Sequence, residues 1–164
     1  MDTQTQKLMF SSKSNEWETP ADFYNKLNNK FKFTLDPCST HENHKCDKYY
    51  TMEDGGLSKS WQDEIVFVNP PYSDIGQWVK KAYEESTQNN AIVVMLIPVR
   101  TDTKYWHDYI MKGASKIFFV KGRLKFQNNI SQEKNHAAPF PSVVVVFGGL
   151  RWSPGPAVAS LERT

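Results

Sequence analysis

The sequence has few cysteines and no long apolar run. Its only cysteines are Cys38 and Cys46 among 164 residues, too few for the disulfide framework of a small secreted protein. The longest apolar run, residues 91–99, is interrupted by Pro98 and is much shorter than the roughly 20 residues of a membrane-spanning helix. Residues 1–15 are polar and lack the apolar core of a signal peptide. We therefore expect a cytoplasmic protein without a membrane segment.

Neither sign of charge dominates the composition. Twenty Lys and Arg against 18 Asp and Glu give a formal net charge of +2, and 39% of the residues are hydrophobic. This balance is typical of a globular domain, and it is compatible with nucleic-acid binding without indicating it. The length predicts one domain. We place this domain at residues 16–149, between a flexible N-terminal segment, 1–15, and a loose C-terminal tail, 150–164.

Apolar strands alternate with amphipathic helices along the chain. Residues 65–68 form a continuous apolar run, which is typical of a strand that is buried on both faces. Residues 75–87 place Ile75, Trp78 and Val79 on one stripe of a helix. This alternation predicts a compact α/β domain whose mostly parallel sheet carries helices on both faces. We predict strands at residues 31–35, 49–51, 65–68, 91–97, 117–120 and 142–147, and helices at 21–29, 75–87 and 104–112.

Polar motifs follow two of the predicted strands. Asp36 and Pro37 come after the first strand, and Asn69 begins a turn directly after residues 65–68. Ligands of parallel α/β sheets bind outside the carboxyl ends of the strands. We therefore expect the two motifs to line one shared site.

The turn Asn69-Pro70-Pro71-Tyr72 contains the groups needed to activate an amino group on an aromatic base. The lone pair of such a nitrogen is delocalised into the ring, so acceptors for its two hydrogens are needed to expose it. The Asn69 side-chain oxygen and the Pro70 carbonyl supply these acceptors without a charged base. Consecutive prolines stiffen the turn, and Tyr72 offers a flat face for a base removed from a duplex. The alternative is a proline-rich turn without a catalytic role.

Several separate motifs occur in an order that is typical of one enzyme family. They are Trp17-Glu18-Thr19-Pro20, Phe33-Thr34-Leu35-Asp36, residues 43–46, Glu53-Asp54-Gly55-Gly56-Leu57, residues 68–73, Trp78-Val79, Leu96-Ile97-Pro98, Thr101-Asp102-Thr103, Gly122-Arg123-Leu124 and residues 138–142. On these motifs, residues 16–147 resemble the compact, phage-type DNA N6-adenine methyltransferases. The resemblance implies a Rossmann-like methyltransferase fold, S-adenosylmethionine as methyl donor and adenine in DNA as acceptor. If the gene belongs to a phage, the protein would work in the cytoplasm of the host cell.

The resemblance also implies which residues bind the methyl donor. Backbone groups at Thr19 would face the methionine carboxylate, as a helix start can. Asp36 would accept from the donor's amino group, although the usual glycine-rich turn after the first strand is absent, and Asp54 would bind its adenine or ribose. The alternatives are that Thr19 caps the helix and that both carboxylates are ordinary turn residues. The residues predicted to bind the donor are Trp17, Thr19, Pro20, Asp36, Pro37, Cys38, Asp54 and Asn69.

A polar excursion at residues 122–141 contains several basic side chains. Lysine and arginine would bind DNA phosphates there without reading the base sequence; the alternative is a solvated hairpin. The chain is short for a separate recognition domain, so sequence preference would come from this excursion, from residues 40–60 or from the partner in a homodimer. The residues predicted to contact nucleic acid are Arg100, Lys121, Arg123, Lys125, Lys134 and His136.

Cys38, His41, His44 and Cys46 are close in sequence and are possible zinc ligands. Their spacing is tighter and less regular than in known zinc modules, so we expect no metal. Two alternatives to methylation of DNA adenine remain. One is methyl transfer to RNA or to another planar nitrogen, and the other is a catalytically inactive relative that binds DNA.

Overall fold

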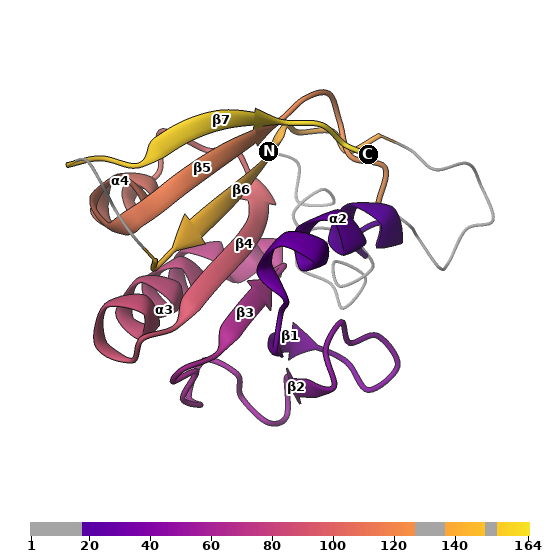
Figure 1. Ribbon diagram of the computed structural model, residues 1–164, viewed down its shortest axis with the longest axis vertical. Helices are drawn as coiled ribbons and strands as arrows, with labels where there is room; N and C mark the ends of the chain where they lie inside the picture. Colours follow the sequence, from indigo (N-terminus) through magenta and orange to yellow (C-terminus); the bar gives the residue numbers. More distant parts are fainter. Residues whose placement is uncertain (1–17, 127–136, 150–153) are drawn as a thin grey trace.

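A seven-stranded mixed sheet forms the centre of the computed structural model, which describes residues 18–126, 137–149 and 154–164 (Figure 1). The strand order is β2-β1-β3-β4-β6-β5-β7. The elements are α2 (Ala21–Phe31), β1 (Leu35–Ser39), β2 (Lys48–Thr51), β3 (Ile65–Val68), η2 (Tyr72–Asp74), α3 (Ile75–Gln88), β4 (Ile92–Pro98), η3 (Trp106–Ile110), α4 (Met111–Gly113), β5 (Ala114–Val120), β6 (Ser142–Phe147) and β7 (Ala157–Leu161).

Most neighbouring strands in the sheet are parallel. β2, β1, β3 and β4 pair in parallel, and β7 pairs in parallel with β5. Among the seven strands of the described residues, only β6 runs in the opposite direction, between β4 and β5. The strands β1, β3, β4 and β5 therefore end at the same side of the sheet, which we call the carboxyl edge. The predicted mostly parallel α/β sheet is confirmed.

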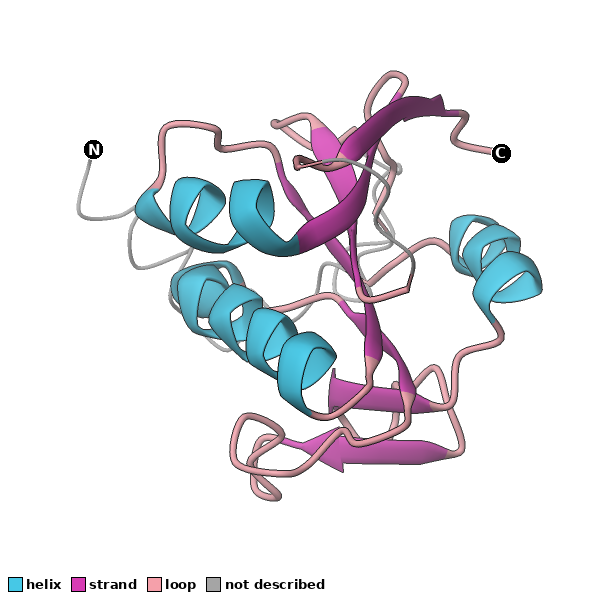
Figure 2. Ribbon diagram, turned by 60° about the vertical axis from the view of Figure 1, so that its left-hand side comes forward, coloured by secondary structure: helices cyan, strands magenta, loops and turns pink. Residues whose placement is uncertain are grey.

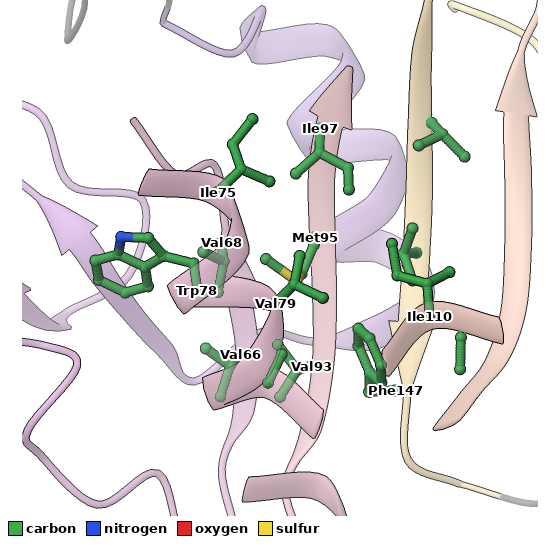
Figure 3. Packing of buried hydrophobic residues seen from close by; sticks show 14 of the residues in the cluster. Val66, Val68, Ile75, Trp78, Val79, Val93, Met95, Ile97, Ile110 and Phe147 are labelled. Carbon is green, nitrogen blue, oxygen red and sulfur yellow. The ribbon is translucent and has the colours of Figure 1, made fainter. Parts of the chain in front are cut away.

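Helices cover both faces of the sheet (Figure 2). Side chains of neighbouring positions alternate between the faces, so Val143 and Val145 lie in one apolar cluster and Val144 lies in the other. The first cluster includes Val79 of α3, which lies over Val68 and Met95 (Figure 3). The second includes Phe23 and Leu27 of α2. The two apolar clusters hold the sheet between the helices, and they therefore fix the position of the carboxyl edge.

The first strand begins later in the structure than the sequence predicts. The helix α2 continues to Phe31 and ends at Lys32, whose left-handed backbone (φ 60°) donates its N–H to the Asn28 carbonyl. Phe31 and Phe33 stack with ring centroids 5.8 Å apart and pack against the second cluster. Their alternation therefore reflects a helix end packed on the core, and the predicted strand at residues 31–35 is wrong.

The prediction of a loose C-terminal tail is wrong for residues 157–161, which form the edge strand β7. This short strand alternates, and Ala159 and Leu161 pack against the second cluster while Val158 is 67% exposed. Proline, glycine and alanine around it concealed this alternation in the sequence. Residues 1–15 and 150–153 lie outside the described residues. No helix in the described ranges is long and apolar enough to cross a membrane.

Replacement of Leu161 tests whether β7 contributes to stability. We expect Leu161→Ala to lower the free energy of unfolding by about 1–2 kcal/mol, since it removes apolar contacts from a partly buried site. Val158→Ala on the exposed side of the strand is the matched control and should change it by less than about 0.5 kcal/mol. Urea denaturation measures both values. Equal values for the two variants would contradict a packed β7.

Candidate active site

A pocket of about 530 Å³ opens at the carboxyl edge. This volume is within the range of small-molecule sites in proteins, roughly 300–1,000 Å³. Both motifs singled out in the sequence line it, and so do residues before α2 and the loop before β3. The lining residues are Glu18, Thr19, residues 36–40, Asn43, Lys45, Thr51, Met52, Gly55, Gly56, Leu57, Phe67, residues 69–74 and Trp78.

Asn69 follows β3 and its side chain is anchored to the chain segment before α2. Its Nδ2 donates a hydrogen bond of 3.1 Å to the hydroxyl oxygen of Thr19, which is 2% exposed. The predicted helix cap at Thr19 is therefore wrong by one residue. Pro20 occupies the cap position and makes no side-chain cap bond, and the Pro20 carbonyl accepts from the N–H of Tyr24. Pro20 itself is not among the residues that line the pocket.

The two prolines after Asn69 form a rigid extended turn. Pro71 has φ −62° and ψ 139°, and its carbonyl accepts the N–H of Asp74 at 3.1 Å, which closes the short helix η2. Within residues 18–126, 137–149 and 154–164, no such bond occupies the Pro70 carbonyl. The turn therefore leaves an acceptor beside Asn69 on the pocket wall.

Tyr72 provides an aromatic wall of the pocket. Burial raises the pKa of its phenol above the usual range, while the charge of Arg100 acts weakly in the opposite direction. The ring is therefore neutral at physiological pH. Phe140, near the end of the 122–141 excursion, meets it edge-on with centroids 5.1 Å apart and an interplanar angle of 87°. Sequence reasoning included Phe140 in a family motif and gave it no role in the site.

Asp36 lies inside β1 and organises the loop between β1 and β2. One carboxylate oxygen accepts the N–H of Cys38 at 3.3 Å, and the other accepts the N–H of Lys45 at 2.9 Å. Burial raises the pKa of this carboxyl group, and the two backbone donors oppose the increase. Burial also raises the pKa of the Cys38 thiol, which stays protonated. Asp36, Pro37 and Cys38 all line the pocket.

Asp54 stabilises a turn next to the pocket. Its Oδ2 accepts from the N–H of Thr51 at 2.8 Å and from the Thr51 hydroxyl at 3.0 Å, and these bonds lower its pKa. The pocket is lined instead by Thr51, Gly55 and Gly56, and Asp54 is not among its lining residues. Asp54 thus makes the contacts of an ordinary turn residue, which was the alternative to a role in donor binding. Trp17 lies outside the described residues.

A buried tryptophan supports the pocket wall at Gly56, and sequence reasoning did not detect it. Trp61 is fully buried and its Nε1 donates to the Gly56 carbonyl at 3.0 Å. The backbone N–H of Trp61 donates to the buried carboxylate of Glu85 at 2.9 Å. Gly56 in turn lies so close to the Pro37 carbonyl that a side chain would overlap it. The two hydrogen bonds of Trp61 and the absence of a side chain at Gly56 together fix this part of the pocket wall.

The predicted nucleic-acid contacts lie partly at the carboxyl edge. Lys121, Arg123 and Lys125 follow β5 and are exposed. Arg123 donates to the Ala138 carbonyl at 3.4 Å, and Lys121 pairs with Glu162 at 3.6 Å. Because they follow the end of β5, these cations lie at the carboxyl edge, and Arg123 contacts the segment that leads to Phe140. Lys134 and His136 lie outside the described residues.

The histidines considered as metal ligands contact Tyr49. His44 stacks on its ring with centroids 3.9 Å apart, and His41 hydrogen-bonds its hydroxyl at 3.0 Å. Cys46 lies 3.7 Å from the Tyr24 hydroxyl. Across the described ranges, no three His, Cys, Asp or Glu side chains gather as a metal site would require.

The sheet and the Asn-Pro-Pro-Tyr turn at its carboxyl edge define a class, the Rossmann-like α/β methyltransferases. The chain matches the family model described as DNA N-6-adenine-methyltransferase (Dam) over residues 6–159. The chain therefore belongs to the DNA N-6-adenine-methyltransferase family, and it is an adenine-specific DNA methyltransferase. This finding confirms the family that the sequence motifs indicated.

Individual relatives show the same similarity. The chain is 33% identical over 134 residues to the DNA N-6-adenine-methyltransferase of Haemophilus phage HP1 (strain HP1c1), covering 80% of this chain and 77% of that protein. It is 34% identical over 110 residues to the enzyme of the same name from Escherichia phage T1, covering 66% and 45%. A putative methyltransferase of Escherichia coli (strain K12) is 36% identical over 64 residues, covering 35% and 70%.

Replacement of Gly56 tests the pocket wall. In Gly56→Ala the new methyl group would push residues 56 and 37 apart, so we expect a loss of about 1–3 kcal/mol in stability and slower adenine methylation. Gly155→Ala is the matched control, because no atom of the described residues lies within 4 Å of its added methyl group. Urea denaturation and methyl incorporation into DNA measure the two effects. Unchanged stability and activity in Gly56→Ala would disprove the close contact.

Proposed function

We propose that the enzyme binds an adenine removed from the DNA duplex on Tyr72 and transfers to its N6 a methyl group from S-adenosylmethionine. The observation that carries this proposal is the position of Asn69 and Pro70 in the same pocket as the end of β1. An acceptor pair for the target amino group and a candidate donor site thus face one cavity. Catalysis then consists of positioning and hydrogen bonding, without a covalent intermediate on the protein.

Asn69 and Pro70 bind the two hydrogens of the adenine amino group in this proposal. The Asn69 amide nitrogen donates to Thr19, so the side-chain oxygen lies at the opposite end of the same planar group. The adjacent Pro70 carbonyl is fixed in direction by its ring and by the turn that follows. Two acceptors oriented in this way favour a tetrahedral nitrogen, because its lone pair is then directed away from both hydrogen bonds.

Tyr72 and Phe140 form the platform for the base. A neutral phenol ring presents a flat, weakly polar face on which a purine can stack. The edge of Phe140 supports that ring from a different segment of the chain. A base removed from the duplex loses stacking with its neighbours, and such a platform restores part of the lost energy.

The pocket also suits S-adenosylmethionine. Its volume of about 530 Å³ can accommodate a ligand of this size, and its wall combines aromatic surface at Trp78 with charged and amide groups. We assign donor binding to Thr19, Pro37, Cys38 and the loop carrying Gly56. When bound, the donor supplies a sulfonium methyl group: the nitrogen forms a bond to that carbon, the carbon–sulfur electron pair stays on sulfur, and the nitrogen loses a proton to solvent.

Basic side chains at the carboxyl edge would position the DNA. Lys121, Arg123 and Lys125 are exposed at the beginning of the 122–141 excursion, and Phe140 lies near its end. Contacts from such side chains to phosphates raise affinity for any sequence and do not select a target. Arg100, whose charge reaches Tyr72, would contact the phosphate next to the flipped base.

Replacement of Asn69 tests the proposed reaction. The purified enzyme is incubated with S-adenosylmethionine and unmethylated DNA, and the DNA is digested and analysed for N6-methyldeoxyadenosine by mass spectrometry. We expect the product with the wild type and a rate lower by on the order of a hundredfold or more with Asn69→Ala. Asn25→Ala on the exposed side of α2 is the control and should retain full activity.

Three results would contradict this assignment. Unchanged turnover by Asn69→Ala would remove Asn69 from the chemistry. No product from the wild type, with binding of S-adenosylhomocysteine intact, would move the acceptor to RNA or to another planar nitrogen. A wild type that binds DNA but no donor analogue would identify an inactive relative.

Replacement of Arg123 tests the proposed DNA contact. Loss of one phosphate contact should weaken binding of unrelated DNA sequences to a similar extent and reduce the slope of log affinity against log salt by about 1. Lys112→Ala, before β5 at the opposite edge of the sheet, is the control and should retain the wild-type slope. Fluorescence anisotropy with labelled duplexes at several salt concentrations gives both slopes. Identical slopes for Arg123→Ala and the wild type would exclude Arg123 from the interface.

A further inference from the structure

An ion pair in the pocket wall has no role in the function described so far. Lys45 Nζ lies 3.2 Å from Glu18 Oε1, and the two side chains are 17% and 22% exposed. Both residues line the pocket at the carboxyl edge. A positive and a negative group thus stand side by side on the surface of a ligand site.

The pair lies next to the proposed reaction centre. Glu18 directly precedes Thr19, whose hydroxyl binds the Asn69 side chain. In S-adenosylmethionine, two methylene groups separate the sulfonium from an α-carbon that carries an ammonium and a carboxylate. A donor whose methyl group is at Asn69 therefore needs partners of both signs close by.

We propose that Lys45 and Glu18 bind the charged amino-acid end of the methyl donor. Lys45 binds the carboxylate and Glu18 binds the ammonium. This assignment rests on the proposed function, because it presumes that the pocket binds S-adenosylmethionine. It adds two side chains to the donor site that sequence reasoning did not select.

The Lys45 backbone is fixed on both sides, which aims its side chain into the pocket. Its N–H donates to Asp36 at 2.9 Å, and its carbonyl accepts from the Tyr24 hydroxyl at 3.0 Å. The second Asp36 oxygen binds the N–H of Cys38. Asp36 is then a positioning residue that orients Lys45, and the ammonium acceptor expected at Asp36 is Glu18 instead.

A purely stabilising role explains the pair poorly. Removing two charges from water costs about as much as their attraction returns, so a half-buried pair adds little net stability. The buried pair Lys81–Glu85 is different, because Glu85 also accepts from the Trp61 N–H and lies outside the pocket. At Lys45–Glu18, a bound zwitterion would give each charge a second partner of opposite sign.

Binding of three ligands to the full-length protein tests the proposal without relying on activity. S-adenosylhomocysteine has the complete amino-acid end. Decarboxylated S-adenosylmethionine has the ammonium only, and 5′-methylthioadenosine has neither group. Calorimetry gives the affinity of each ligand for the wild type, Lys45→Met and Glu18→Gln. Lys48→Met is the matched control, because Lys48 pairs with Glu64 outside the pocket.

The proposal predicts a different pattern for each variant. Lys45→Met should weaken S-adenosylhomocysteine roughly ten- to hundredfold, as expected for the loss of one charge-assisted bond, and should not weaken the other two ligands. Glu18→Gln should weaken both ligands that carry the ammonium by about tenfold and leave 5′-methylthioadenosine unchanged. Lys48→Met should bind all three ligands as the wild type does.

Two outcomes overturn the proposal while the donor site stands. One is unchanged affinity for S-adenosylhomocysteine in both variants. The other is an equal loss for all three ligands, which would show a structural role for the pair. A wild type that binds neither S-adenosylhomocysteine nor 5′-methylthioadenosine would instead overturn the proposed function itself, and this assignment with it.

Discussion

The hydrogen bond between Asn69 and Thr19 connects the two halves of the site. It joins residues 50 positions apart, one at the end of β3 and one just before α2. The sheet makes this contact possible, because β1 pairs with β3 at Leu35 and Val66 and so aligns their carboxyl ends. The Thr19 hydroxyl is then committed to the amide and not to the helix. An amide fixed in this way would need no reorganisation in the role that we propose for it, which is to bind the amino group of the substrate.

Buried carboxylates build the loops around the pocket. Asp36 binds two backbone N–H groups of the β1–β2 region, and Glu85 binds the backbone of Trp61 behind Gly56. Each of these acceptors satisfies donors that irregular chain would otherwise leave unpaired. The glycine-rich turn expected after the first strand is absent, and Asp36 organises the chain there instead. The wall is thus specified by single polar contacts as much as by apolar packing.

The sequence predicted the central strands well, and with them the position of the Asn-Pro-Pro-Tyr turn in the pocket wall. The ranges 65–68 and 142–147 match β3 and β6, because continuous β-branched runs are characteristic of doubly buried strands. Outside the core, the predicted strands and helices depended on the local spacing of apolar residues. These predictions were wrong where tertiary contacts determine the structure. The aromatic pair Phe31 and Phe33 imitated a strand, and the short strand β7 was hidden among turn-forming residues.

The site was predictable as a motif but not as a set of contacts. Asn69 and Asp36 could be located because they follow or enter strands of one sheet. Glu18, Lys45 and Phe140 reach the pocket from separate segments, and nothing in their local sequence indicates that they meet. Such contacts arise from the path of the chain between elements, which local pattern does not encode.

A crystal structure with S-adenosylhomocysteine and an oligonucleotide containing the mapped target adenine would show which groups bind the adenine amino group. We expect a flipped adenine stacked on Tyr72, with N6 within hydrogen-bond distance of the Asn69 side-chain oxygen and the Pro70 carbonyl. An adenine amino group bound by other acceptors, with Asn69 still bonded only within the protein, would contradict this expectation.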